Sequence, residues 1–122
     1  MQTQTETKVF LPLADHKDHN ELKIEVEYDL GGHNYFTSKP IRRGYSVYVI
    51  PLTRNGDFAA TQALFGGPKE SGFKVFLEET QRKSAKRLAE LTAKVLPLGE
   101  QIRDLFQSGQ YQKVGELIKS SI

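Results

Sequence analysis

Cysteine and tryptophan are absent from the 122 residues, and methionine occurs once. Without cysteine the chain has no disulfide, no thiolate zinc site and no cysteine nucleophile. This composition suits a reducing compartment, and we expect a cytoplasmic protein. Hydrophobic residues make up 38% of the chain, so the core must be built from Leu, Val, Ile, Phe and Tyr.

Long hydrophobic runs are missing as well. No segment approaches the roughly 20 apolar residues that span a bilayer, so we expect no membrane contact. Residues 1–7, MQTQTET, lack the basic and apolar regions of a secretory signal and predict a polar tail. Residues 8–122 have the length of one domain.

Motifs for catalysis and metal binding are also lacking. The sequence has no Gly-x-Ser-x-Gly, no Walker lysine loop and no His-Glu-x-x-His. His16 and His19 have a spacing that two metal ligands could share, but no third strong ligand lies nearby. We therefore expect a protein that is not an enzyme and that holds neither a metal nor a cofactor. An active site whose residues have no recognisable spacing is the alternative left open.

The first pattern in the sequence is an alternation of side chains with a period of two residues. In residues 22–28 apolar and charged side chains alternate strictly, which is the pattern of a half-buried strand. Residues 45–52 are apolar on both sides, as in a central strand. Asn55-Gly56 favours a tight hairpin turn that returns the chain as a further strand. The strands expected are therefore residues 9–13, 22–28, 45–52 and 58–65.

From residue 71 the period changes to about 3.6, which predicts helices. Ser71 is a suitable cap for a long helix that continues to about residue 95, and Pro97 breaks or kinks it. Two short helices follow, separated by a turn at Ser108-Gly109. Their expected inward residues are Ile102, Leu105, Phe106, Tyr111, Val114, Leu117 and Ile118.

Strands followed by helices predict an α+β fold. We expect a four-stranded antiparallel sheet in residues 8–66, followed in residues 71–121 by a long helix and a short C-terminal helical hairpin. Together they form a single α+β domain over residues 8–122.

Aromatic and basic side chains alternate through residues 33–45. No acidic residue occurs in residues 39–54, and a second acid-free basic cluster occupies residues 82–87. Single-stranded nucleic acid needs rings on which bases stack and cations that meet phosphates. We therefore predict non-enzymatic, low-specificity binding of single-stranded nucleic acid, DNA rather than RNA, by this loop and the adjoining sheet face. The candidate residues are Tyr35, Phe36, Lys39, Arg42, Arg43, Tyr45, Tyr48, Arg54, Arg82, Lys83, Lys86 and Arg87.

The same residues also have a structural interpretation. Rings beside a strand are usually part of the core, and Lys or Arg on a helix usually form a solvated face with acidic partners. Binding therefore depends on whether rings and cations share an exposed surface.

The order of elements has a counterpart among known folds. Four antiparallel strands, a basic-Gly-aromatic entry into a strand and then a long helix resemble the arrangement of Whirly-type and transcriptional-coactivator-type single-strand binders. The similarity covers residues 8–96 in topology and residues 42–47, RRGYSV, in motif. It implies that the sheet contacts the nucleic acid and that long helices mediate oligomers. The two further C-terminal helices depart from that pattern.

The C-terminal helices suggest an alternative function. Their apolar sides either cover the core of this domain or bind another subunit. The alternative prediction is therefore a protein–protein interaction or assembly module that uses these helices, with a homo-oligomer as one form.

Overall fold

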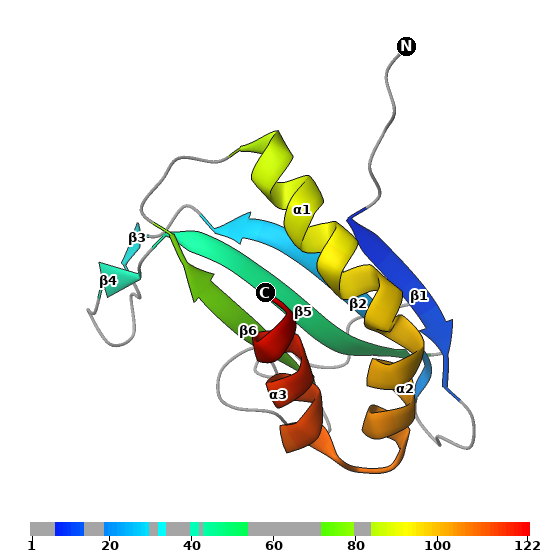
Figure 1. The fold of residues 1–122 in the computed structure, drawn as a ribbon. Helices are drawn as coiled ribbons and strands as arrows, with labels where there is room; N and C mark the ends of the chain where they lie inside the picture. Colours follow the sequence, from blue (N-terminus) through cyan, green and yellow to red (C-terminus); the bar gives the residue numbers. More distant parts are fainter. Residues whose placement is uncertain are drawn as a thin grey trace.

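The computed structural model describes residues 7–13, 19–29, 32–33, 40–41, 43–53, 72–79 and 84–122. In chain order the strands are β1 (Lys8–Pro12), β2 (His19–Asp29), β3 (Gly32–His33), β4 (Pro40–Ile41), β5 (Gly44–Thr53) and β6 (Phe73–Glu78). The helices are α1 (Ala85–Val95), the 3-10 turn η2 (Leu96–Leu98), α2 (Gly99–Gln107) and α3 (Tyr111–Ser121). The predicted α+β class is confirmed: a four-stranded antiparallel sheet is followed by helices (Figure 1).

The sheet has the strand order β1-β2-β5-β6, and each neighbouring pair is antiparallel. Strands β2 and β5 lie at its centre and pair along almost their whole length, from His19 opposite Thr53 to Asp29 opposite Gly44. The small strands β3 and β4 pair separately with each other. The central position predicted for residues 45–52 is confirmed, and β1 lies at one edge of the sheet.

Alternation decides which side chains enter the core. In β2, Leu22, Ile24 and Val26 are buried against the helices, while the charged residues between them point to the other face. Strand β5 has buried side chains on both faces, with Val47 and Val49 on the helix side. The two-sided apolar pattern of residues 45–52 therefore corresponds to burial on both faces of β5, which distinguishes it from the equally central β2.

The long helix begins later than predicted. Residues 73–78, expected to be helical, form strand β6, so the division into a sheet of residues 8–66 and a helical part of residues 71–121 is wrong at this point. Phe73 and Val75 are buried and pair with β5, whereas Lys74 and Phe76 point to the other face. A segment this short fits both periods, and pairing with the edge of β5 decides between them. The strand predicted over residues 58–65 and the cap at Ser71 lie outside the described residues.

The helices form a second layer on one face of the sheet (Figure 1). Helix α1 begins after Ser84, whose side chain accepts a hydrogen bond from the backbone N–H of Arg87. Pro97 lies within η2, the 3-10 turn between α1 and α2. The break or kink predicted at this proline is therefore confirmed. Gly109, with φ of 75°, turns the chain between α2 and α3 at the predicted place.

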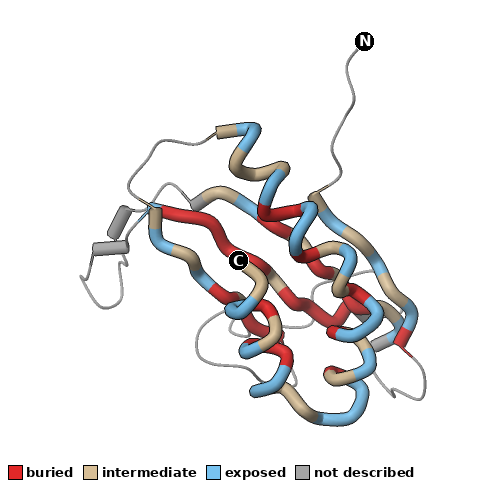
Figure 2. The backbone as a smooth tube through the Cα atoms, in the orientation of Figure 1, coloured by how far each residue is buried: buried red, intermediate tan, exposed pale blue. Residues whose placement is uncertain are grey.

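The core lies between the two layers (Figure 2). The apolar sides of all three helices face the sheet, and their outward residues are polar or small. The predicted inward residues of the C-terminal helices are confirmed as buried or partly buried: Ile102, Leu105, Phe106, Tyr111, Val114, Leu117 and Ile118. Among the described helices, none combines the length and the apolar character that crossing a membrane demands.

Gly44 sets the distance between β5 and β6. A Cβ atom at this position would overlap the backbone carbonyl oxygen of Leu77. We predict that Gly44→Ala lowers the free energy of unfolding by more than about 3 kcal/mol, because the two strands must separate. Urea denaturation followed by circular dichroism measures the loss.

Gly109→Ala is the matched control. Gly109 has a positive φ, but nothing lies within 4 Å of its would-be Cβ. Backbone strain alone then costs about 1 kcal/mol. Equal losses in the two variants would contradict the role given to Gly44.

Candidate nucleic-acid interface

The structure describes only part of the predicted binding set. Tyr35, Phe36, Lys39, Arg42, Arg54, Arg82 and Lys83 lie outside the described residues, so their part in binding stays a prediction. The described members are Arg43, Tyr45, Tyr48, Lys86 and Arg87. These five do not form one surface.

Tyr45 and Tyr48 lie on opposite faces of the sheet. Tyr45 is opposite Tyr28 and Leu77 on the helix side and is only 1% exposed. Its ring packs edge-on against Tyr28, with centroids 5.2 Å apart. The prediction that Tyr45 stacks on a base is therefore wrong. Residues three apart in a strand point to opposite faces, so Tyr45 cannot share a surface with Tyr48.

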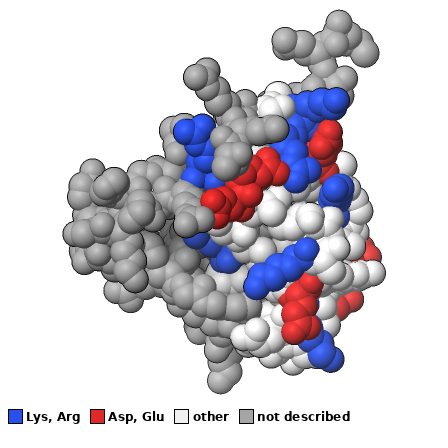
Figure 3. Space-filling view, turned by 60° about the vertical axis from the view of Figure 1, so that its left-hand side comes forward, with Lys and Arg blue, Asp and Glu red and all other residues white. Residues whose placement is uncertain are grey.

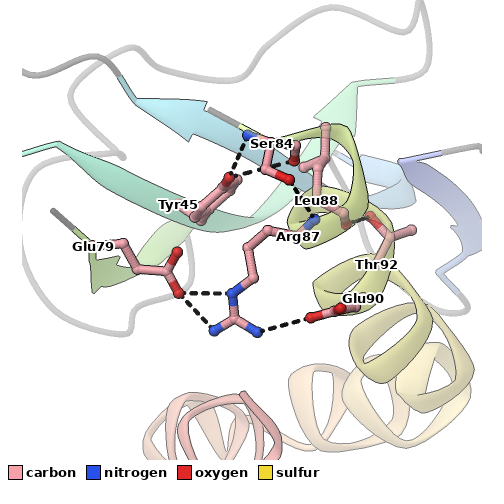
Figure 4. Close-up of polar contacts among 7 residues, drawn as sticks. All are labelled: Tyr45, Glu79, Ser84, Arg87, Leu88, Glu90 and Thr92. Carbon is pink, nitrogen blue, oxygen red and sulfur yellow. Dashed lines mark hydrogen bonds and ion pairs between the residues drawn. The ribbon is translucent and has the colours of Figure 1, made fainter. Parts of the chain in front are cut away.

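The hydroxyl of Tyr45 instead fixes the start of α1 (Figure 4). It accepts a hydrogen bond of 3.1 Å from the backbone N–H of Ser84, the residue that caps this helix. Helix N-termini have backbone donors without helical partners, and capping side chains satisfy them. The buried tyrosine thus joins β5 to α1 and has a structural role.

Arg87 belongs to the same cluster, which we call the Arg87 cluster: Tyr45, Glu79, Ser84, Arg87 and Glu90. Its guanidinium contacts one carboxylate oxygen of Glu79 through Nε at 2.7 Å and Nη2 at 2.6 Å. Nη1 lies 3.5 Å from Glu90. The hydrogen bond to Glu79 raises the pKa of Arg87 above its ordinary value. Two carboxylates therefore balance this charge, and Arg87 does not contribute an unbalanced positive charge to the predicted basic track.

Arg43 and Lys86 are both exposed. Arg43 directly precedes β5, and its backbone carbonyl accepts a hydrogen bond from Glu79 N–H at 3.1 Å. Lys86 lies in the first turn of α1, within the helical layer, on the other side of the sheet from Tyr48. Figure 3 shows Lys and Arg side chains interspersed with Asp and Glu on the visible face. The described residues on this face therefore do not gather into one basic patch.

The face of the sheet turned away from the helices, here called the outer face, carries the exposed rings. Phe10 is 46% exposed and Phe76 is 38% exposed, and both point to this face, as does the half-buried Tyr48. The Nζ atom of Lys74 lies 5.9 Å from the centre of the Tyr48 ring. The register assigns these side chains to the outer face: Lys8, Phe10, Pro12, Glu21, Lys23, Glu25, Glu27, Ser46, Tyr48, Ile50, Leu52, Lys74, Phe76 and Glu78.

Phe10 and Phe76 were missed by the sequence prediction for different reasons. Phe10 alternates with Val9 and Leu11, which pack against the core, so strict alternation would have placed it outside. Phe76 was assigned to a helix, where its direction has no relation to the sheet. Single exposed apolar residues are common on protein surfaces, so Phe10 and Phe76 are informative only because they share one face of the sheet.

The outer face is neither uniformly open nor basic. Ile50 is 3% exposed and Leu52 is 7% exposed, so the end of the face near Leu52 is covered. The register gives this face three lysines and four glutamates, and Lys23 lies 3.2 Å from Glu25. Within the described residues, no group of three or more His, Asp or Glu side chains could hold a metal ion.

The burial of Tyr45 leads to a test. We predict that Tyr45→Phe lowers the free energy of unfolding by about 1 kcal/mol, because the N–H of Ser84 loses its acceptor. Affinity for single-stranded oligonucleotides should not change, because the ring lies in the core. Urea denaturation and fluorescence anisotropy measure the two effects. A loss of affinity without a loss of stability would contradict the buried role.

The chain was also compared with known proteins. No protein-family model matches it, and no match was found among curated proteins or among solved structures. A function for this chain must therefore be derived from its own residues.

Proposed function

We propose that this protein binds single-stranded nucleic acid on the outer face of its sheet, with Phe10, Tyr48 and Phe76 as stacking residues. The observation that supports this proposal is the position of the three rings. They belong to three different strands and point to one face. Phe10 and Phe76 are the exposed large apolar side chains of the described residues, and Tyr48 between them is half-buried. A planar base can cover such a ring, and each stacked base contributes about 1–3 kcal/mol.

The register spaces the rings along a diagonal of the sheet. Phe10 is opposite Lys23, Tyr48 is opposite Glu25 one row further along, and Phe76 is opposite Ser46 in the next row. From ordinary strand spacings, Tyr48 and Phe76 are about 8 Å apart and Phe10 and Tyr48 about 12 Å apart at Cα. Each ring can therefore take a different base, and a single strand can cross the sheet from β1 to β6.

Charge on the outer face limits how the phosphates are held. Lys8 on β1 and Lys74 on β6 lie towards the two edges of the sheet, whereas the glutamates of β2 lie between them. We expect the phosphates to meet the lysines and the bases to lie over the rings. Lys23 is paired with Glu25. If Lys8 and Lys74 each neutralise one phosphate, the slope of log K against log salt is about −1.4. Arg43 and the predicted loop bases would make the slope steeper.

The alternative, an assembly module that uses the C-terminal helices, has less support. The apolar residues of α2 and α3, including Ile102, Phe106 and Ile118, are buried in the domain's own core. The outward residues of these helices are mostly polar. A protein partner would find its apolar anchors on the outer face instead, so the experiment below separates stacking from ordinary apolar docking.

The test uses Phe10→Leu and Phe76→Leu. Leucine keeps an apolar side chain but removes the flat ring on which a base stacks. We predict that each variant weakens binding of a fluorescein-labelled single-stranded DNA about five- to a hundredfold, as loss of one stacked base requires. Fluorescence anisotropy at two salt concentrations, with a matched RNA for comparison, measures affinity and salt slope.

Gln101→Leu is the control, because it introduces the same leucine at an exposed position of α2, in the helical layer. Its affinity should equal that of the unmodified protein. Absence of binding at low salt would refute the proposed function. Unchanged affinity in both phenylalanine variants would show that bases do not stack on the outer face. A protein partner would then be the better explanation of the exposed rings.

A further inference from the structure

Carboxylates lie next to the rings of the outer face. Glu25 on β2 is directly opposite Tyr48 on β5, and Glu27 is opposite Ser46, which is in turn opposite Phe76. Side chains directly opposite each other in an antiparallel pair have Cβ atoms about 5 Å apart. A base stacked on Tyr48 therefore brings one of its edges near Glu25.

The carboxylate of Glu25 affects which base can lie on the Tyr48 ring. An ionised carboxylate only accepts hydrogen bonds, with two oxygens and about four acceptor positions. Cytosine and adenine carry an exocyclic amine that donates to such a group, whereas thymine carries a carbonyl at the corresponding position. Glu25 thus favours an amine-bearing base and opposes a carbonyl edge.

The surroundings of Glu25 strengthen this effect. Its side chain is 15% exposed, so less water competes for it than at a fully exposed carboxylate, and a hydrogen bond there is stronger. Lys23 lies 3.2 Å from one carboxylate oxygen and holds the side chain in place. The ion pair occupies only part of the acceptor capacity of the carboxylate.

We infer that the outer face selects unpaired bases that carry an exocyclic amine, such as cytosine, over thymine, and that Glu25 is the residue that determines this preference. The inference rests on the proposed function, because it assigns a base to the ring of Tyr48. It also gives the glutamates of β2 a role, since on electrostatic grounds alone they oppose nucleic-acid binding.

The experiment compares single-stranded DNA of equal length made of cytosine or of thymine, at neutral pH and one salt concentration. We expect the cytosine strand to bind about fivefold more tightly, the lower end of what one good base contact gives. Glu25→Gln should bring the two affinities close together, because an amide both donates and accepts. The thymine strand should bind more tightly than to the unmodified protein, because its carbonyl edge gains a donor and a negative charge is removed near the phosphates.

Glu100→Gln is the matched control. Glu100 is exposed in the first turn of α2, in the helical layer, so the variant removes the same charge without touching the outer face. The ratio of the two affinities should stay at its original value. Unfolding by urea checks that Glu25→Gln retains its fold.

The possible failures are distinguishable. If both strands bind but thymine binds as well as cytosine, the base preference is refuted while the proposed function stands. If the preference exists but persists in Glu25→Gln, Glu25 is not the residue that determines it. If neither strand binds, the proposed function itself is refuted together with this inference.

Discussion

The antiparallel pairing of β2 with β5 is the constraint on which the rest of the structure depends. It fixes the register of the two central strands, and alternation then assigns each of their side chains to one of two faces. One face receives Leu22, Ile24, Val26 and the valines of β5 and is sealed by the helices. The other face receives charged residues and the ring of Tyr48. A shift of one residue would exchange the two sets, so the core and the candidate interface are specified together.

The Arg87 cluster connects this sheet to the helical layer. Tyr45 reaches it from β5 and Glu79 from the end of β6, while Ser84 and Arg87 belong to the start of α1. The sequence suggested that Tyr45 and Arg87 contact nucleic acid. In the structure these two residues instead hold the sheet and the helical layer together. Of the described candidate rings, Tyr45 therefore belongs to the core and Tyr48 to the outer face.

The sequence allowed the α+β class, both central strands and the C-terminal hairpin to be predicted, because their periods are long and unmixed. Strand β6 was predicted as helix because its six residues fit the period of a strand as well as that of a helix. Only the pairing with β5 shows that they form a strand. Among the site residues, Tyr45 is buried in the core, whereas the half-buried Tyr48 points to the outer face and its part in binding stays a prediction. Composition shows which chemical groups are available, but only register shows which face they share. For that reason Phe10 could be found by strict alternation and Phe76 only after β6 was known.

The pairing of β2 with β5 also has a kinetic consequence. It brings together residues as far apart as His19 and Thr53, while α2 and α3 meet across a turn of a few residues. Closing a long loop costs chain entropy before any contact compensates for it, whereas local contacts form early. We therefore expect the helical hairpin to form fast and transiently, and the joining of the two central strands to set the rate at which the whole domain folds.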